Sequence, residues 1–240
     1  MAVAIHYTQQ GFVARVEGAE SVPLAELVAF LDDLAANDAA RVVVLPLSGR
    51  PSPPDPLSRL RTSRERGSSR ALTSASVGEE PGGKREALAL TPLPTVAALS
   101  GTAGRAALDV AGACDIRICD SETRFHSEWR MRTGASSGMH PLPAGPNFDA
   151  QAALAEGLVS EVTPPGEALT RALALAETIA SRGPIATRLA KEAIWRGRAM
   201  PLAQALRFET DLTLLLQTTK DRAEGVSAFI EKRKPSFTGN

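Results

Sequence analysis

Residues 94–119 read PTVAALSGTAGRAALDVAGACDIRIC, and this stretch decides the class of fold. The runs PTVAAL and CDIRIC are short and apolar and contain β-branched residues, so both are predicted to be strands. The small residues between them are predicted to form a helix. A strand, a helix and a strand within this length make one crossover unit, which joins parallel strands. The stretch therefore predicts an α/β protein.

The residues before this unit continue the α/β pattern. Residues 3–7 and 11–18 are predicted strands around a polar turn, and the apolar run at 40–47 is predicted to be a strand buried on both faces. Between them, Ser21 is the predicted N-cap of a helix with one apolar face. The side chains on that face are Leu24, Leu27, Val28, Leu31 and Leu34.

The chain becomes helical after Pro165. Glycine and proline divide this part into four predicted helices, as helix ends require. They cover residues 166–183, 184–197, 201–218 and 221–235. We therefore divide the chain into an α/β core at residues 1–164 and a helical C-terminal region at residues 165–240.

Residues 48–83 differ from the rest of the core. They are dense in proline, glycine, serine and charge and show no sustained period. The composition predicts a long surface loop or a partly disordered segment, with room for a short helix near its middle. A long loop in a compact domain is often functional, and mere disorder is the competing interpretation.

The composition excludes several classes of protein. Lys and Arg together number 27, as do Asp and Glu, so no basic field favours nucleic acid or an anionic membrane surface. The N-terminus lacks the features of a signal peptide, and no apolar run is long enough to span a membrane. The histidines, His6, His126 and His140, lack metal-ligand spacing. We expect a cytoplasmic protein without a metal site.

The two cysteines are predicted to be unpaired. Cys114 and Cys119 are five residues apart on a predicted strand, and an odd spacing directs their side chains to opposite faces. Two thiols without a partner are typical of a reducing compartment.

Five sequence motifs in this layout carry a resemblance to a known family. They are PTVAALSG, ACDIRIC, AALAEGLVSEVTP, PIATRLAKEAI and DRAEGVSAFIEKRKPSF. In this order, over residues 40–236, the chain resembles the enoyl-CoA hydratase/isomerase (crotonase) family. The resemblance implies a core of repeated strand–strand–helix turns and C-terminal helices that make a homotrimer or a dimer of trimers. It also implies an acyl-CoA or acyl-carrier thioester as substrate, with no cofactor besides the coenzyme A of that substrate.

In the family, two backbone N–H groups form an oxyanion hole that holds the thioester oxygen as it becomes an enolate, the charge-stabilising step of the reaction. The resemblance assigns one donor to Ala106, within a run of Arg105, Ala106 and Ala107 where the family has three glycines. The other donor position falls on Pro54 or Pro56, and proline has no N–H. On the family template, half of this oxyanion hole is missing.

Asp109 falls where the hydratases of the family carry their first catalytic glutamate, and the shorter side chain places its carboxylate differently. Three interpretations are open. Arg105 and Asp109 are four residues apart and form a surface ion pair; Arg105 faces a ligand phosphate or carboxylate; or Asp109 is a catalytic base.

The second family carboxylate corresponds to Glu128, which stands one residue early and without the usual proline. In an ungapped register Trp129 takes that position instead. Nearby, His126 and His140 are alternative proton carriers, each with a structural role as the competing interpretation.

In the intact segment AFIEKR, Phe229 and Lys232 match family positions near the nucleotide end of coenzyme A. A core aromatic residue and a solvated lysine are the competing interpretations. The departures from the family pattern leave three hypotheses: a divergent lyase or isomerase on an acyl thioester, a catalytically silent thioester-binding or partner protein, and an ordinary enoyl-CoA hydratase.

Overall fold

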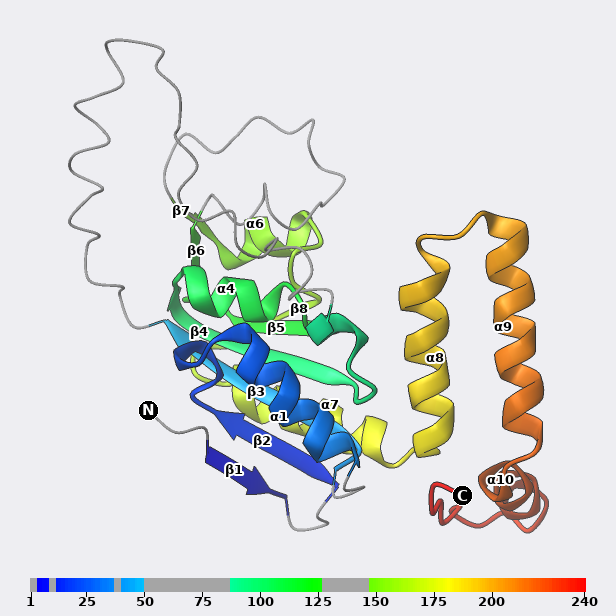
Figure 1. Ribbon diagram of the computed structural model, residues 1–240. Coiled ribbons are helices and arrows are strands. Elements are labelled where there is room, and N and C mark those ends of the chain that lie inside the picture. The colour runs from blue at the N-terminus through cyan, green and yellow to red at the C-terminus, as the bar shows by residue number, and fades with distance from the viewer. Residues whose placement is uncertain (1–3, 9–11, 37–39, 50–86, 127–146) are drawn as a thin grey trace, which may run out of the picture.

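The computed structural model describes residues 4–8, 12–36, 40–49, 87–126 and 147–240. In these residues eight strands form one sheet with the order β1-β2-β3-β4-β5-β8, and β6 pairs with β4 and with β7 (Figure 1). The strands are β1 Ala4–Tyr7, β2 Val13–Glu17, β3 Val42–Gly49, β4 Thr95–Ala103, β5 Ile116–Asp120, β6 Arg124–His126, β7 Asn147–Asp149 and β8 Glu161–Thr163. The β1–β2 and β6–β7 pairs are antiparallel, and the other pairs are parallel.

Helices cover both faces of the sheet. The helices are η1 Ala19–Ser21, α1 Leu24–Ala36, α4 Arg105–Ala111, α6 Ala150–Ala155, α7 Ala168–Ala180, α8 Pro184–Gly197, α9 Leu202–Gln217 and α10 Lys220–Ile230. One core cluster joins α1 and α4 to side chains such as Val43 and Leu45 of β3. A second cluster joins α7 to the alternate residues Val42 and Val44. The continuous apolar run of β3 thus serves both faces, as the sequence predicts for a doubly covered strand.

The helix α7 packs on the sheet through a stripe of small residues. Ala168, Ala172, Ala176 and Ala180 recur every four residues, and all are buried. This spacing places them on one face of the helix, where their small size permits close approach to the strands. The C-terminal helices lie close to their predicted ranges. The boundary between residues 164 and 165 stays a prediction, although α7 belongs to the packing of the core.

The prediction of a helix directly after PTVAAL was wrong at its start. The strand β4 continues to Ala103, because Thr102 and Ala103 pair with Arg124 and Phe125 of β6. Gly101 has a φ of 67°, a conformation that glycine adopts freely, at the position where β4 changes partners. The helix α4 is therefore short, Arg105–Ala111. A strand pairing made over a long sequence distance extended β4 beyond what its local pattern indicates.

The two cysteines are free, as predicted, but the geometric reason was wrong. Cys114 precedes β5 rather than lying on it, and its thiol donates to the carbonyl of Val110 at 3.3 Å. Cys114 and Cys119 are buried in the same core cluster, not on opposite faces.

Both thiols should be unreactive in the folded protein. Burial, with a smaller contribution from a neighbouring aspartate, raises the pKa of Cys114 and of Cys119 to about 12. Since the thiolate is the nucleophile, iodoacetamide near pH 8 should add to neither thiol before unfolding and to both after it. Intact-mass spectrometry counts the adducts. An adduct on the folded protein would show that one of these sites is open.

A helical arm stands beside the core. It consists of α8, α9 and α10, with α8 and α9 side by side and α10 crossing below them (Figure 1). The chain after α10 returns to the core, where Arg41 donates through Nη2 to the carbonyl of Phe237 at 2.7 Å. Large apolar side chains are exposed on the arm: Ile194, Leu202, Leu206, Leu214, Leu215, Val226, Phe229 and Ile230.

Candidate active site

Three parallel strands bring distant parts of the chain to one edge of the sheet. Gly49 at the end of β3 pairs with Gly101 of β4, and Ala103 at the end of β4 pairs with Phe125 of β6. The carboxyl ends of parallel strands are the usual place for ligand sites in α/β proteins. The helix α4 begins at this edge, and the segments after Gly49 and His126 continue from it.

The first turn of α4 presents an open backbone amide. Gly104 is the N-cap, and its carbonyl accepts the N–H of Leu108 at 3.0 Å. The N–H groups of a first helical turn have no partner within the helix. Ala106 is exposed, and no described residue accepts its N–H. The partial positive charge of a helix N-terminus favours an oxygen anion at such an amide.

Asp109 lies on the same side of α4 as Ala106. Ala107, Leu108 and Val110 are buried in the core, whereas Ala106 is exposed and Asp109 is half-buried. Residues three apart are neighbours on a helix surface, and helical side chains lean toward the N-terminus. Asp109 therefore follows Ala106 by about one turn on the side of α4 that the core does not fully cover.

Other predicted residues fall outside the described part of the chain. Glu128, Trp129, His140, Pro54 and Pro56 all do so. His126 is described: it is exposed at the end of β6, next to Phe125, whose ring stacks on Phe148 at a centroid distance of 5.4 Å.

Phe229 and Lys232 lie on the arm, away from α4 (Figure 1). The side chain of Phe229 is 84% exposed, so it is not a core aromatic residue in this chain. Lys232 has a φ of 55° and ends α10 in a left-handed cap. In that cap the N–H of Lys232 donates to Phe229 at 3.3 Å and that of Arg233 to Ala228 at 3.0 Å. Within a single chain, neither Phe229 nor Lys232 lies at the sheet edge where α4 begins.

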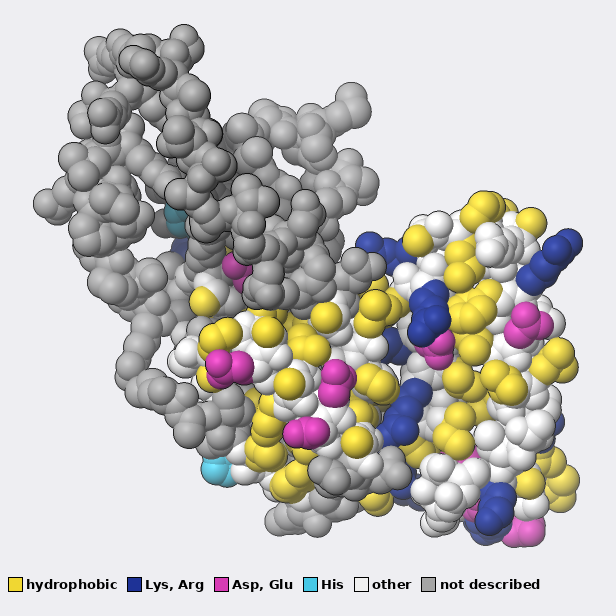
Figure 2. Space-filling view, in the orientation of Figure 1, with side chains coloured by type: hydrophobic (Ala, Val, Ile, Leu, Met, Phe, Trp, Pro, Cys, Tyr) yellow, Lys and Arg dark blue, Asp and Glu magenta, His cyan; other side chains and the backbone are white. Residues whose placement is uncertain are grey.

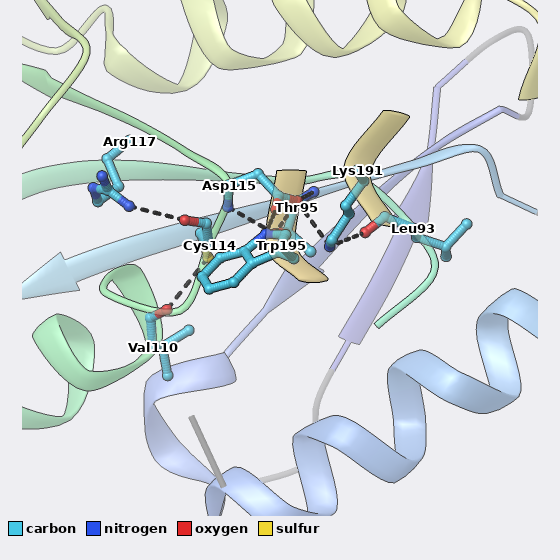
Figure 3. A network of polar contacts seen from close by, with 8 residues as sticks. All are labelled: Leu93, Thr95, Val110, Cys114, Asp115, Arg117, Lys191 and Trp195. Atoms are coloured by element: carbon cyan, nitrogen blue, oxygen red, sulfur yellow. Dashed lines mark hydrogen bonds and ion pairs between the residues drawn. The ribbon is translucent and has the colours of Figure 1, made fainter. Parts of the chain in front are cut away.

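A polar cluster around Asp115 was missed in the sequence. Its carboxylate accepts Thr95 N at 2.8 Å and Thr95 Oγ1 at 2.9 Å, and it pairs with Lys191 Nζ at 2.8 Å. Trp195 Nε1 donates to it at 2.8 Å, and Lys191 Nζ also donates to the carbonyl of Leu93 at 2.8 Å (Figure 3).

This cluster, which we call the Asp115 cluster, consists of Thr95, Asp115, Lys191, Trp195 and the carbonyl of Leu93. Lys191 and Trp195 project from α8 and Thr95 begins β4, so the cluster fastens the arm to the sheet. The sequence held one indication of this cluster: Lys191 and Trp195 are four residues apart, which places their side chains on the same face of a helix.

Among the described residues there is neither a metal-binding cluster nor a membrane-spanning helix. No described group of three or more His, Cys, Asp or Glu side chains is arranged to hold a metal ion. Among the described helices, none combines the length and the apolar character that a membrane span requires.

Known proteins match this chain over much of its length. The Enoyl-CoA hydratase/isomerase family model matches residues 127–240. The chain is 35% identical over 163 residues to the protein named Probable enoyl-CoA hydratase 2, mitochondrial, of Arabidopsis thaliana, covering 62% of this chain and 54% of that protein. It is 34% identical over 166 residues to the protein named Probable enoyl-CoA hydratase echA8 of Mycobacterium bovis, covering 63% of this chain and 65% of that protein.

The likeness in structure covers the whole chain. The crystal structure of enoyl-CoA hydratase from Bacillus anthracis superposes with a TM-score of 0.72 at 24% identity, covering 100% of both chains. The fold is therefore the crotonase fold. With the sequence matches, the chain belongs to the enoyl-CoA hydratase/isomerase family. The sequence matches span between about half and two thirds of the length of the two named relatives.

Proposed function

We propose that the protein is an enzyme that acts on an acyl thioester, bound to coenzyme A or to a carrier protein, through enolate-type chemistry. The observation that carries this proposal is the shared sheet edge. There α4, which carries Ala106 and Asp109, begins directly after β4, and the end of β4 pairs with β6. Glu128 follows the end of β6 by two residues. Relatives named as enoyl-CoA hydratases support the same chemistry.

The reaction that we propose is the addition of water to an enoyl thioester. The Ala106 N–H donates to the thioester oxygen, which gains negative charge as hydroxide adds to the β-carbon; one such donor contributes about 10²–10³ in rate. One carboxylate of the pair Asp109 and Glu128 takes the proton of the attacking water. The other returns a proton to the α-carbon as the enolate collapses. From the sequence alone, we assign to Arg105 the positive charge that replaces the donor missing at Pro54 or Pro56.

A silent thioester-binding or partner protein is the second candidate. The residues that favour it are Arg105, Ala106 and Ala107 in place of the family's three glycines, and the prolines at 54 and 56. Turnover separates the two candidates. The protein is titrated with free coenzyme A, crotonyl-CoA and a long-chain acyl-CoA by calorimetry, and each mixture is analysed by mass spectrometry. Binding with a product heavier by one water supports the enzyme, and binding without product supports the silent protein.

We further propose that the arm assembles the protein as a homotrimer or a dimer of trimers. Its exposed apolar side chains need cover, and Phe229 and Lys232 would then reach the site of a neighbouring copy rather than their own. Sedimentation equilibrium should give three or six times the chain mass of 25.2 kDa. Leu206→Arg should lower that mass, whereas Thr213→Arg on the same helix is the control for added charge alone. A monomeric wild-type protein would refute the assembly.

Two expectations accompany this proposal. The enzyme needs no cofactor besides the coenzyme A of its substrate, because enolate chemistry uses only hydrogen bonds and proton transfer. The balanced charge and the two free cysteines are our grounds for placing it in the cytoplasm.

A further inference from the structure

A second candidate site lies at the other end of α4. A cavity of about 610 Å³ extends between the start of β5, the turn before β8 and the helix α8. Ile116, Leu158 and Ile194 line it together with the indole of Trp195. Cavities of 300–1,000 Å³ with mostly apolar walls are typical of small-molecule sites. Gly112 and Cys114, which follow α4, lie on its wall, so it is separate from the amide of Ala106.

The charge on the cavity wall is positive. Asp115 is the one carboxylate among the lining residues, and both of its oxygens are already occupied within the Asp115 cluster. Lys191 is neutralised by that carboxylate. Arg198 makes no ion pair with a described residue. Arg117 feels the charge of Asp115, but its guanidinium hydrogen-bonds to backbone carbonyls and not to that carboxylate. Figure 2 shows Lys and Arg side chains gathered along the junction between the core and the arm.

Both arginines have donors to spare. Arg117 uses Nε toward the carbonyl of Leu158 at 2.6 Å and Nη1 toward that of Cys114 at 2.9 Å, which leaves Nη2 without an acceptor in the described part of the chain. Arg198 lies over the ring of Trp195 at 4.4 Å from its centroid. Its guanidinium makes no hydrogen bond or ion pair with a described residue. A guanidinium fixed by an aromatic face presents its edge to a carboxylate in bidentate geometry.

We propose that this cavity binds an organic anion with one carboxylate and a long apolar body, of the class of a medium-chain fatty acid. The carboxylate pairs with Arg198, with Arg117 as a second donor, and the hydrocarbon lies against Ile116, Leu158 and Ile194. A neutral apolar ligand would leave the guanidinium groups without a partner, and a cation would be repelled by them. This proposal goes beyond the thioester chemistry and does not depend on it.

Decanoate is the probe, and decanol is its neutral counterpart of equal chain length. The chain has two tryptophans, so a Trp129→Phe background leaves Trp195 on the cavity wall as the sole reporter. Decanoate should change the Trp195 fluorescence in a saturable way, with a calorimetric heat that gives the same affinity. Decanol should bind more weakly.

Three variants make the test specific. Arg198→Gln should weaken decanoate binding about 10- to 100-fold, because a hydrogen-bonded ion pair is lost. It should leave decanol unaffected. Arg182→Gln removes the same charge from an exposed position outside the cavity and should change nothing. Ala190→Phe adds volume from an exposed position on α8 that lines the cavity, and it should block both ligands.

Three results would overturn the proposal. They are the absence of saturable decanoate binding, equal affinities for decanoate and decanol, and an affinity that Arg198→Gln leaves unchanged. If Ala190→Phe lowers the mass of the assembly in solution, the cavity is a contact between copies of the chain instead of a ligand site. Arg198 is exposed, so its variant should fold and keep the test decisive.

Discussion

Lys191→Met is expected to lower the free energy of unfolding by about 3–5 kcal/mol, the usual cost of removing one partner of a buried ion pair. The Lys191 side chain is 8% exposed and the Asp115 side chain 18% exposed, so solvent cannot replace the lost ammonium well. Thr95 and Trp195 would still donate to Asp115, but its negative charge would have no counter-ion. Urea unfolding followed by circular dichroism measures the change.

Two further variants control this experiment. Lys234→Met removes the same charge from an exposed position after α10 and should change the stability little. Lys191→Met combined with Asp115→Asn should cost less than the sum of the single changes, because the uncompensated charge is gone. A Lys191→Met protein as stable as the wild type would show that the Asp115 cluster does not fasten the arm.

The second large effect concerns catalysis. Asp109→Asn and Glu128→Gln should each lower kcat for crotonyl-CoA hydration by about 10²–10⁴, the range for loss of a general acid or base. The expected cause is a missing proton transfer, since each amide keeps the shape of the carboxylate. Thermal unfolding of each variant should match that of the wild type.

Matched controls lie on α9. Asp211→Asn and Glu209→Gln make the same chemical changes at exposed positions on the arm and should leave kcat unchanged. If Asp109→Asn also keeps the wild-type rate, Asp109 takes no part in catalysis and has only a structural role on α4. The same outcome for Glu128→Gln would remove the second carboxylate from the mechanism.

Local patterns in the sequence were sufficient for much of the fold. The apolar run of β3 and the period of α7 to α10 are visible within single segments. Each resemblance motif is likewise a short continuous stretch of the chain. The length of β4 was not predictable in this way. Its last residues, Thr102 and Ala103, are strand because β6 lies beside them, a pairing between segments more than 20 residues apart.

The residues of the candidate site also differ in whether local sequence predicts them. The placement of Ala106 and Asp109 on α4 follows from residues close together in the chain, so the resemblance could assign both. The Asp115 cluster joins Asp115 to Lys191 on α8, a contact between segments far apart in sequence. The spacing of Lys191 and Trp195 places both on one face of α8 but does not show that Asp115 is their partner. Phe229 was assigned to the substrate, yet within one chain it lies on α10, away from α4.

The most direct test of the proposed function is the rate of crotonyl-CoA hydration by the wild type and by Ala106→Pro, measured side by side. Proline removes the N–H of Ala106, and the first turn of a helix tolerates it. We expect the wild type to form the hydrated product and Ala106→Pro to lower kcat by about 10²–10³ with unchanged thermal stability. Equal rates for the two proteins, or a wild type that binds crotonyl-CoA without forming product, would contradict a thioester enzyme with its oxyanion donor at Ala106.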